Sequence, residues 1–112
     1  MKEVIHKNLK SIVAESTSHA IGEKRILLNG SECESMLTQA AIGSLLEGEF
    51  VDNHVHPTME EFYFFLKGEA KITINNVDHF CEKDTFIKIP KDSIHSLQAI
   101  TAIDFIYWGI AI

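Results

Sequence analysis

The strongest structural signal in this 112-residue chain is the segment His54-Val55-His56-Pro57-Thr58-Met59-Glu60-Glu61-Phe62-Tyr63-Phe64-Phe65-Leu66-Lys67-Gly68. Residues two apart on an extended strand project from the same face, so a strand would let His54 and His56 reach one ion side by side. A helix would splay them apart. After Pro57 a second alternating run begins, and it can bring Glu61 back to the same ion. The segment therefore predicts two neighbouring β-strands that share a set of metal ligands.

A third histidine completes this set. His95 lies beyond another strand-like run, residues 85–89, and just past Pro90, where a turn could aim it into the same cavity. Imidazole and carboxylate groups together suit a transition metal. The predicted ligands are His54, His56, Glu61 and His95. Only a fold that curls its strands around a centre brings them together.

The spacing of these residues resembles the first motif of the cupin superfamily of small β-barrels, which reads Gly, five residues, His-x-His, three or four residues, Glu, six residues, Gly. Every position is matched, by Gly48, His54, His56, Glu61 and Gly68. The resemblance covers roughly residues 36–112. It implies a jelly-roll barrel with a metal ion inside.

The second cupin motif is only half kept. Pro90 and His95 stand where the family has them, whereas Asp84, Asp92 and Ala99 replace the usual Gly, Gly and Asn. These departures affect turns and a supporting residue. The resemblance therefore still implies that His95 is the fourth ligand.

Glu60 competes with Glu61 for the carboxylate role, since the family tolerates a spacing of three or four residues after the second histidine. Six residues separate Glu61 from Gly68, as the motif requires, but seven separate Glu60 from it. Alternation also places Glu60 with Phe62 and Phe64, on the face away from the ion. Both arguments favour Glu61.

The ligand set indicates a working metal site. Three neutral imidazoles and one carboxylate leave a divalent ion with one residual positive charge and, in octahedral geometry, two open positions. A structural zinc site would be closed and typically richer in cysteine. The predicted cofactor is one divalent transition metal, and the ligands do not choose among Fe, Mn, Ni, Co, Cu and Zn.

The resemblance to metal-dependent cupins implies an enzyme of the dioxygenase, isomerase or lyase type that acts on a small molecule. Glu61 would then be a ligand and not a base. The candidate catalytic residue for proton transfer is Tyr63, which is expected on the same strand face as Glu61. The alternative is Asp52, which is expected on the same strand face as His54. The simpler interpretations are that Tyr63 lines the cavity wall and that Asp52 is solvated.

Two other functions stay open. A non-catalytic barrel would bind or sense a sugar or another metabolite, since a fold does not fix a function. A metal-free barrel would serve as an interaction protein. Metal analysis and turnover measurements separate these three hypotheses.

Polar residues outside the motifs have simpler interpretations. Hydrogen-bonded core or surface histidines are expected at His6, His19 and His79. Lys24 and Arg25 form a polar cluster with His19 ahead of the barrel, most simply a solvated surface; the alternative is that the cluster reaches an anionic ligand over the cavity mouth. Gln39 has the same two interpretations.

Composition excludes several classes of protein. Hydrophobic residues make up 46% and charged residues 23% of the chain, which is typical of one globular domain. The net charge of -6 argues against a nucleic-acid partner, because phosphate binding requires a basic surface. No stretch has the length and hydrophobicity to span a bilayer, and the N-terminus lacks the apolar core of a signal peptide. We therefore expect a cytoplasmic protein with a small-molecule ligand and no membrane partner. Cys33 and Cys81 lack the spacing of a disulfide framework, so each is most simply a free thiol that packs against its neighbours.

Short strands separated by turns indicate an all-β jelly-roll barrel. Residues 1–35 are expected to form an N-terminal arm, with a short helix or irregular segment at 7–16, and the first strands; residues 36–112 form the barrel core of the same domain. The eight or nine strands are expected at 25–28, 34–42, 49–56, the aromatic run that ends at Gly68, 70–74, 77–81, 85–89, 95–100 and 101–112.

Two of these strands, residues 62–66 and 103–112, carry more apolar surface than the interior of one small barrel requires. Strands that are apolar on both faces are covered on both faces. The N-terminal arm is one candidate cover, but exposed apolar patches of this size usually mark a partner surface. The sequence therefore predicts a homodimer.

Overall fold

A computed structural model describes residues 3–112, which form ten strands and two short 3₁₀ helices. The helices are η1 (Leu9–Ser11) and η2 (Gly30–Glu32). The strands are β1 (Glu15–Ser16), β2 (Glu23–Asn29), β3 (Leu37–Leu45), β4 (Phe50–His54), β5 (Met59–Lys67), β6 (Ala70–Ile74), β7 (Val77–Cys81), β8 (Phe86–Ile89), β9 (His95–Ala99) and β10 (Ile103–Ala111).

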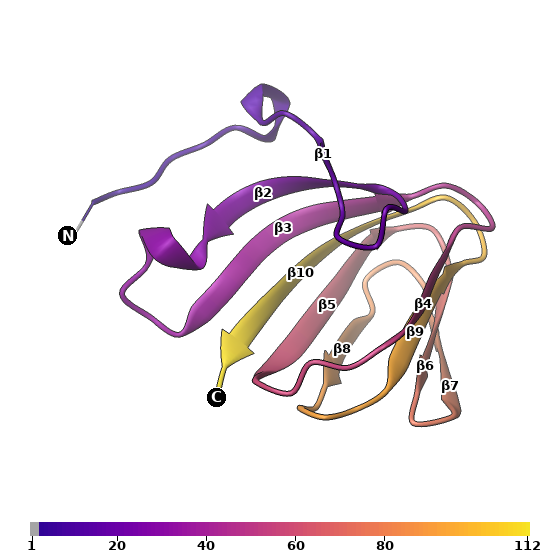
Figure 1. Cartoon of the computed structure of the whole chain (residues 1–112). Helices are drawn as coiled ribbons and strands as arrows, with labels where there is room; N and C mark the ends of the chain where they lie inside the picture. Colours follow the sequence, from indigo (N-terminus) through magenta and orange to yellow (C-terminus); the bar gives the residue numbers. More distant parts are fainter. Residues whose placement is uncertain (1–2) are drawn as a thin grey trace.

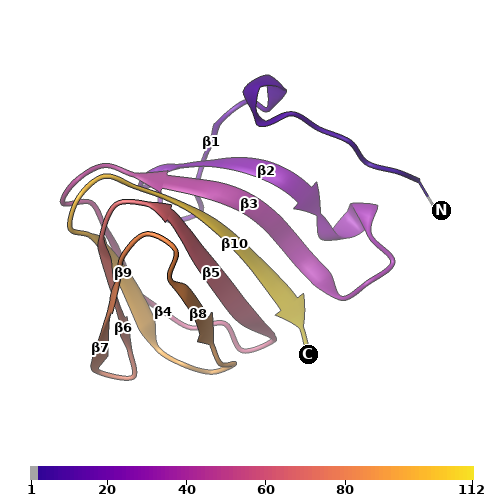
Figure 2. The ribbon, with the colours of Figure 1, turned by 180° about the vertical axis from the view of Figure 1, so that it is seen from behind.

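The strands form two sheets that curl toward each other (Figure 1; seen from behind in Figure 2). One sheet has the order β1-β2-β3-β10-β5-β8 and the other the order β4-β9-β6-β7. Every strand pair is antiparallel. This arrangement confirms the predicted all-β jelly roll.

Most strands lie within a few residues of their predicted positions, and two differences have local causes. The strand expected at 34–42 instead runs from Leu37 to Leu45, because η2 and the turn after it occupy the preceding residues. The structure also has β1, a two-residue strand that pairs with β2, in the segment expected to be a short helix or irregular arm. That segment begins with the single turn of η1.

The core lies between the two sheets and follows the alternation of the strands. In β6, Ala70, Ile72 and Ile74 are buried, whereas Lys71 and Thr73 are only partly covered. Phe65 of β5 is fully buried. Burying a side chain of this size contributes about 1.5–3 kcal/mol. Cys81 is a free thiol packed in this core, and Cys33 is a free thiol that is half-buried.

The two aspartates that replace glycines of the second motif keep the backbone of those turns. Asp84 has φ 69° and Asp92 has φ 64°, both in the left-handed region that favours glycine. Aspartate tolerates this region better than most residues. The amide of Asp92 donates to the carbonyl of His56 at 3.1 Å, so this turn ties the loop before β9 to the loop after β4.

The outer face of the six-stranded sheet carries an aromatic cluster, defined as Phe62, Phe86 and Trp108. The Phe62 and Trp108 rings are stacked with centroids 5.5 Å apart, and Phe86 lies 6.3 Å from each and is 55% exposed. The described part of the N-terminal arm, from residue 3 onward, does not cover this cluster. It runs beside β2, where Lys7 donates to the carbonyl of Leu27, and away from β5 and β8 (Figures 1 and 2).

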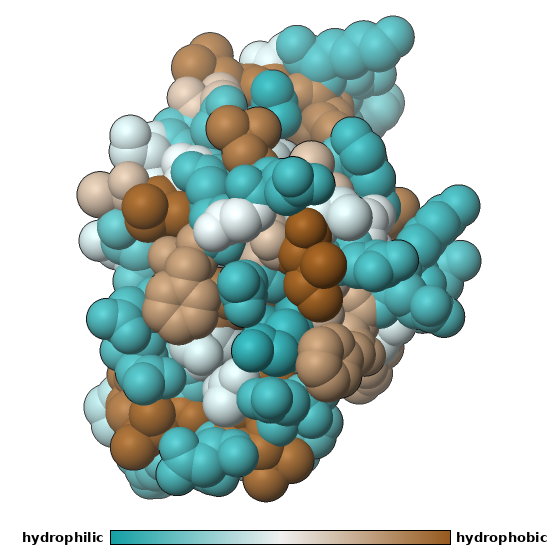
Figure 3. Space-filling view, turned by 90° about the vertical axis from the view of Figure 1, so that its right-hand side faces the viewer, coloured by the Kyte–Doolittle hydropathy of each residue, from teal (hydrophilic) through white to brown (hydrophobic). Residues whose placement is uncertain are grey.

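The four-stranded sheet lies on another side of the molecule. Figure 3 shows that on this side hydrophobic side chains are interspersed with hydrophilic ones. Exposed apolar residues of this sheet include Phe80, which is 71% exposed. Within residues 3–112 no helix has the length and hydrophobicity needed to cross a bilayer.

Candidate metal centre

Four side chains from separate segments converge inside the barrel. His54 ends β4, His56 follows it in the loop, Glu61 lies in β5 and His95 begins β9, directly opposite His54 in the sheet register. One ligand atom of each lies within 4.8 Å of the corresponding atoms of the others. The predicted convergence is therefore observed, and the four residues form a candidate metal site.

Backbone carbonyls fix the orientation of two of the three imidazoles. Nδ1 of His54 lies 2.8 Å from the carbonyl oxygen of Asp52, and Nδ1 of His95 lies 2.9 Å from that of Ser93. A carbonyl oxygen only accepts, so Nδ1 carries the proton in both rings. Each neutral ring then directs the lone pair of Nε2 into the site, which is the form that binds a metal.

The two most deeply buried ligands leave polar atoms without a partner. Oε1 of Glu61 and Nε2 of His95 are buried and have no hydrogen bond within the described residues. These atoms lie 3.3 Å apart, and Nε2 of His56 lies 3.7 Å from the same carboxylate oxygen. Buried polar atoms without partners are costly, and a cation among them would satisfy both. The donor set therefore fits a transition metal ion.

The pKa values of the histidines reflect this crowding. Burial lowers the pKa of His54 and His56, and His95 nearby lowers both further. Burial alone would lower the pKa of His95 too, but the adjacent Glu61 carboxylate and the Ser93 carbonyl outweigh it, and the net shift is upward. In the metal-free protein His95 is thus the ligand that holds a proton most readily.

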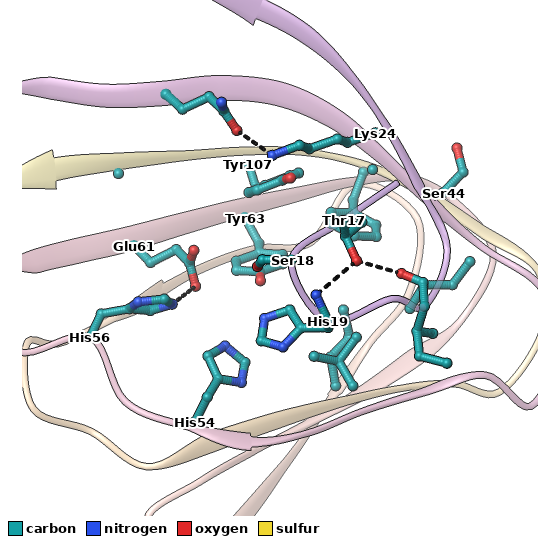
Figure 4. Close-up of a pocket in the computed structure, with 18 of the residues that line it drawn as sticks. Thr17, Ser18, His19, Lys24, Ser44, His54, His56, Glu61, Tyr63 and Tyr107 are labelled. Carbon is teal, nitrogen blue, oxygen red and sulfur yellow. Dashed lines mark hydrogen bonds and ion pairs between the residues drawn. The ribbon is translucent and has the colours of Figure 1, made fainter. Parts of the chain in front are cut away.

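A cavity of about 210 Å³, lined by three of the four residues, His54, His56 and Glu61, extends toward β2 and β3. Tyr63 and Tyr107 line it, and Figure 4 shows Tyr63 beside Glu61 with Tyr107 above them. Burial, with the Glu61 carboxylate nearby, raises the pKa of Tyr63 well above its ordinary value and that of Tyr107 to about 12. Both hydroxyls therefore stay protonated at neutral pH.

The turn between β1 and β2 places His19 beside this site, in agreement with the alternative prediction that its polar cluster reaches the cavity mouth. The rings of His19 and His54 have centroids 4.5 Å apart, and Figure 4 shows His19 between His54 and Tyr63. The hydroxyl of Thr17 donates to the carbonyl of Ile21 and accepts from the amide of His19, which closes the turn. The interpretation of His19 as a surface histidine is thus incomplete: it is exposed, but it lines the cavity.

The structure separates the remaining candidates. Lys24 and Gln39 line the cavity, whereas Arg25 does not.

Glu60 points outward and pairs with Lys88 at 3.1 Å, as the choice of Glu61 requires. The side chain of Asp52 is exposed and accepts from the amide of Asn53, so Asp52 serves the site through its backbone carbonyl. Outside the cavity lie His6 and His79, both exposed.

Comparisons with known proteins agree with this architecture. The chain is similar to the crystal structure of a predicted oxalate decarboxylase from Thermotoga maritima, with 21% identity, a TM-score of 0.87 and coverage of 98% of this chain and 100% of that one. It is similar to ectoine synthase from P. lautus, with 15% identity, a TM-score of 0.83 and coverage of 96% and 78%. An RmlC-like cupin from Shewanella frigidimarina gives 13% identity, a TM-score of 0.82 and coverage of 98% and 93%. At these identities the likeness shows the fold alone.

A search of curated proteins finds no significant match. The family model described as "Cupin domain" matches residues 42–107, a span that begins near the end of β3 and reaches into β10. This span covers more than half of the chain and contains all four residues of the candidate site. By this match and by its two-sheet jelly roll, the chain belongs to the cupin domain family.

Proposed function

We propose that this protein binds one divalent transition metal through His54, His56, Glu61 and His95 and uses it to transform a small molecule. The observation that carries the proposal is the buried pair formed by Oε1 of Glu61 and Nε2 of His95, which face each other without hydrogen-bond partners. Two buried acceptors in this position are stabilised when a cation lies between them.

A bound ion in this set would act as a Lewis acid toward an oxygen atom of the substrate. The chain's own residues supply the rest of the site. Tyr63 and Tyr107 are in register with each other on β5 and β10, so their hydroxyls enter the cavity side by side. Because burial and the neighbouring carboxylate raise the pKa of both hydroxyls, Tyr63 is better suited to donate a hydrogen bond to the substrate than to act as a base.

The proposed reaction class is dioxygenase, isomerase or lyase. Two of the similar structures are named as enzymes, a predicted oxalate decarboxylase and an ectoine synthase, and these names support catalysis without defining a reaction. The metal identity is left open among Fe, Mn, Ni, Co, Cu and Zn, because imidazole and carboxylate ligands accept all of them.

The second candidate function is binding or sensing of a metabolite without turnover. One observation favours it: the tyrosines of the cavity stay protonated, and two of its histidines and Glu61 belong to the metal set. Among the described lining residues, His19 and the exposed Glu23 are the remaining groups that could accept a proton. Turnover separates the two functions. Metal-loaded protein is mixed with dioxygen and with diketones, thiols, phenols and sugar phosphates, and oxygen uptake and products are followed.

Metal analysis tests the shared part of both functions. Protein expressed with metal supplementation should carry about one equivalent of a transition metal, and changing His54 and His56 together to Ala should abolish it. His79→Ala is the matched control, because His79 lies in β7 outside the cavity and its loss should leave the metal content unchanged. Less than about a tenth of an equivalent in the unaltered protein would contradict both functions.

The proposed partners are a second copy of the chain and a small-molecule ligand. The aromatic cluster of Phe62, Phe86 and Trp108 supports a homodimer, because the arm of the same chain does not cover it. The net charge of -6 supports the proposal that nucleic acid is not a partner.

A further inference from the structure

Lys24 is a cationic group that faces the cavity without a counter-ion. Its Nζ donates to Oε1 of Gln39 at 3.1 Å, and Nε2 of Gln39 in turn donates to Oδ1 of Asn29 at 2.9 Å. Within residues 3–112 the lysines with an ion pair are Lys7 and Lys88, so the Lys24 ammonium is held by a neutral amide alone. Figure 4 shows the Lys24 side chain running along the strands at the edge of the cavity, next to Tyr107.

Neighbouring strands hold this ammonium in place. Gln39 is the register partner of Asn29, whereas Lys24 is opposite Gly43, so the Lys24 side chain runs along the sheet to reach Gln39. Lys24 is half-buried at the cavity wall. A partly buried ammonium with a single neutral partner has two further N–H groups available to a ligand.

Two further donors line the cavity. The hydroxyls of Tyr63 and Tyr107 can each donate an O–H hydrogen bond, and the carboxylate of Glu61 belongs to the metal set. The remaining acidic lining residue, Glu23, is exposed at the rim. With a metal ion present, the interior therefore offers positive charge and N–H or O–H donors, which suits a ligand rich in acceptor oxygens and negatively charged.

The cavity limits the size of that ligand. Its volume of about 210 Å³ equals the liquid volume of about seven water molecules. Its apolar wall consists of Ile21, Leu45, Val51, Leu97 and Phe105. A ligand of on the order of ten non-hydrogen atoms, with a short carbon skeleton, would fill this space.

We infer that the ligand of this cavity is a small carboxylate with a second oxygen function: the carboxylate pairs with Lys24, and the second oxygen is directed to the metal centre. This inference rests on the proposed function, because it takes the metal as one of the two anchors. It adds the chemical class of the ligand and the residue that selects it.

A matched pair of probes tests the role of the charge. Acetoacetate and acetylacetone have the same number of non-hydrogen atoms and each offers a ketone oxygen to the metal centre, but only acetoacetate carries a carboxylate for Lys24. Each is titrated into zinc-loaded protein at pH 7 and followed by calorimetry, with zinc content measured before and after. Acetoacetate should bind about tenfold or more tightly than acetylacetone, the difference expected for a charge-assisted hydrogen bond.

Variants assign this preference to one residue. Lys24→Met should remove the preference and leave the zinc content unchanged, whereas Lys24→Arg, which keeps the charge, should retain most of it. Lys71→Met removes the same charge from the outward face of β6 and should behave like the unaltered protein.

Two results would overturn the inference while leaving the proposed function intact. One is equal or absent binding of the two probes by zinc-loaded protein. The other is an unchanged preference for acetoacetate in Lys24→Met. A protein that takes up no metal fails earlier, before any probe is added, and that failure belongs to the proposed function.

Discussion

Nε2 of His95 lies 3.3 Å from Oε1 of Glu61 in a part of the barrel from which water is largely excluded, and neither atom has a hydrogen-bond partner among the described residues. Because Nδ1 of His95 donates to the carbonyl of Ser93, a neutral His95 presents a lone pair to the lone pairs of the carboxylate. Two acceptors in this position repel unless a proton or a metal ion lies between them. We therefore expect the site to exchange a proton for a metal ion.

This exchange makes metal affinity dependent on pH. Glu61 and the Ser93 carbonyl, acting against burial, raise the pKa of His95 above its ordinary 6.5, so below that raised value an incoming metal must displace a proton from Nε2. Burial lowers the pKa of His54 and His56, so these rings stay neutral to lower pH and compete less. The apparent dissociation constant should rise by up to about tenfold for each pH unit below the pKa of His95.

Thermal unfolding gives a second measurement of the same effect. A raised pKa means that protonated His95 stabilises the metal-free fold at low pH, and this contribution is lost as pH rises through the folded-state pKa. The increase in Tm caused by added metal should thus be larger at pH 8 than at pH 6. Equal increases at both values would contradict the proton exchange.

Glu61→Gln should separate metal binding from stability. The amide can donate an N–H to Nε2 of His95, so the buried acceptor gains the partner that it lacks in the unaltered protein. Metal content should fall to background because the charged ligand is gone. At pH 8 the free energy of unfolding of the metal-free variant, measured by chemical denaturation, should equal that of the metal-free parent or exceed it by up to about 1–3 kcal/mol.

Glu60→Gln is the matched control for this change. Glu60 is the neighbouring residue on β5, but it points outward and its carboxylate pairs with Lys88 at 3.1 Å. Losing a surface ion pair costs about 0–1 kcal/mol, so stability should change little. Metal content should be unchanged. Loss of metal in Glu60→Gln would mean that the wrong glutamate has been assigned to the site.

The sequence predicted strands best where alternation and turn chemistry agree. Residues 70–74 and 77–81 match β6 and β7, and the turn between them has Asn75 at φ 48° and Asn76 at φ 67°, the left-handed pair that a tight hairpin requires. The start of β3 was predicted three residues early. There the Glu32 carboxylate accepts from the amide of Asn29 and starts η2, a local contact that the apolar pattern does not reveal.

The ligand set was predictable because it depends on short spacings within or beside strands. For His19 the cavity mouth was predicted only as an alternative to a solvated surface, because it approaches His54 through a turn of the N-terminal arm and no spacing relates these two residues. Alternation on β10 groups Tyr107 with Phe105 and Gly109, and the antiparallel register places it opposite Tyr63. Tyr107 was nevertheless missed, because assigning it to the cavity requires the order of the strands, which one sequence does not give.

The two glycines of the first motif should differ in what a methyl group costs. Gly48 has φ +82° with nothing within 4 Å of an added Cβ, so Gly48→Ala should cost about 1–2 kcal/mol of backbone strain. Gly68 has φ +80°, and its added Cβ would also collide with the carbonyl oxygen of Ala102. Gly68→Ala should therefore cost at least about 3 kcal/mol in denaturant unfolding, or prevent folding. Equal costs would show that backbone conformation alone explains both positions.

The aromatic cluster provides the test of the proposed homodimer. The parent protein should run as a dimer in light scattering at micromolar concentration, and Phe86→Lys should convert it to a monomer, because a charge would be buried in an apolar interface. Phe86 is 55% exposed in one copy, so this change should leave the fold and the metal content intact. Phe80→Lys, on the four-stranded sheet and 71% exposed, is the control and should stay dimeric. A monomeric parent protein, or dissociation by Phe80→Lys alone, would exclude this cluster as the interface.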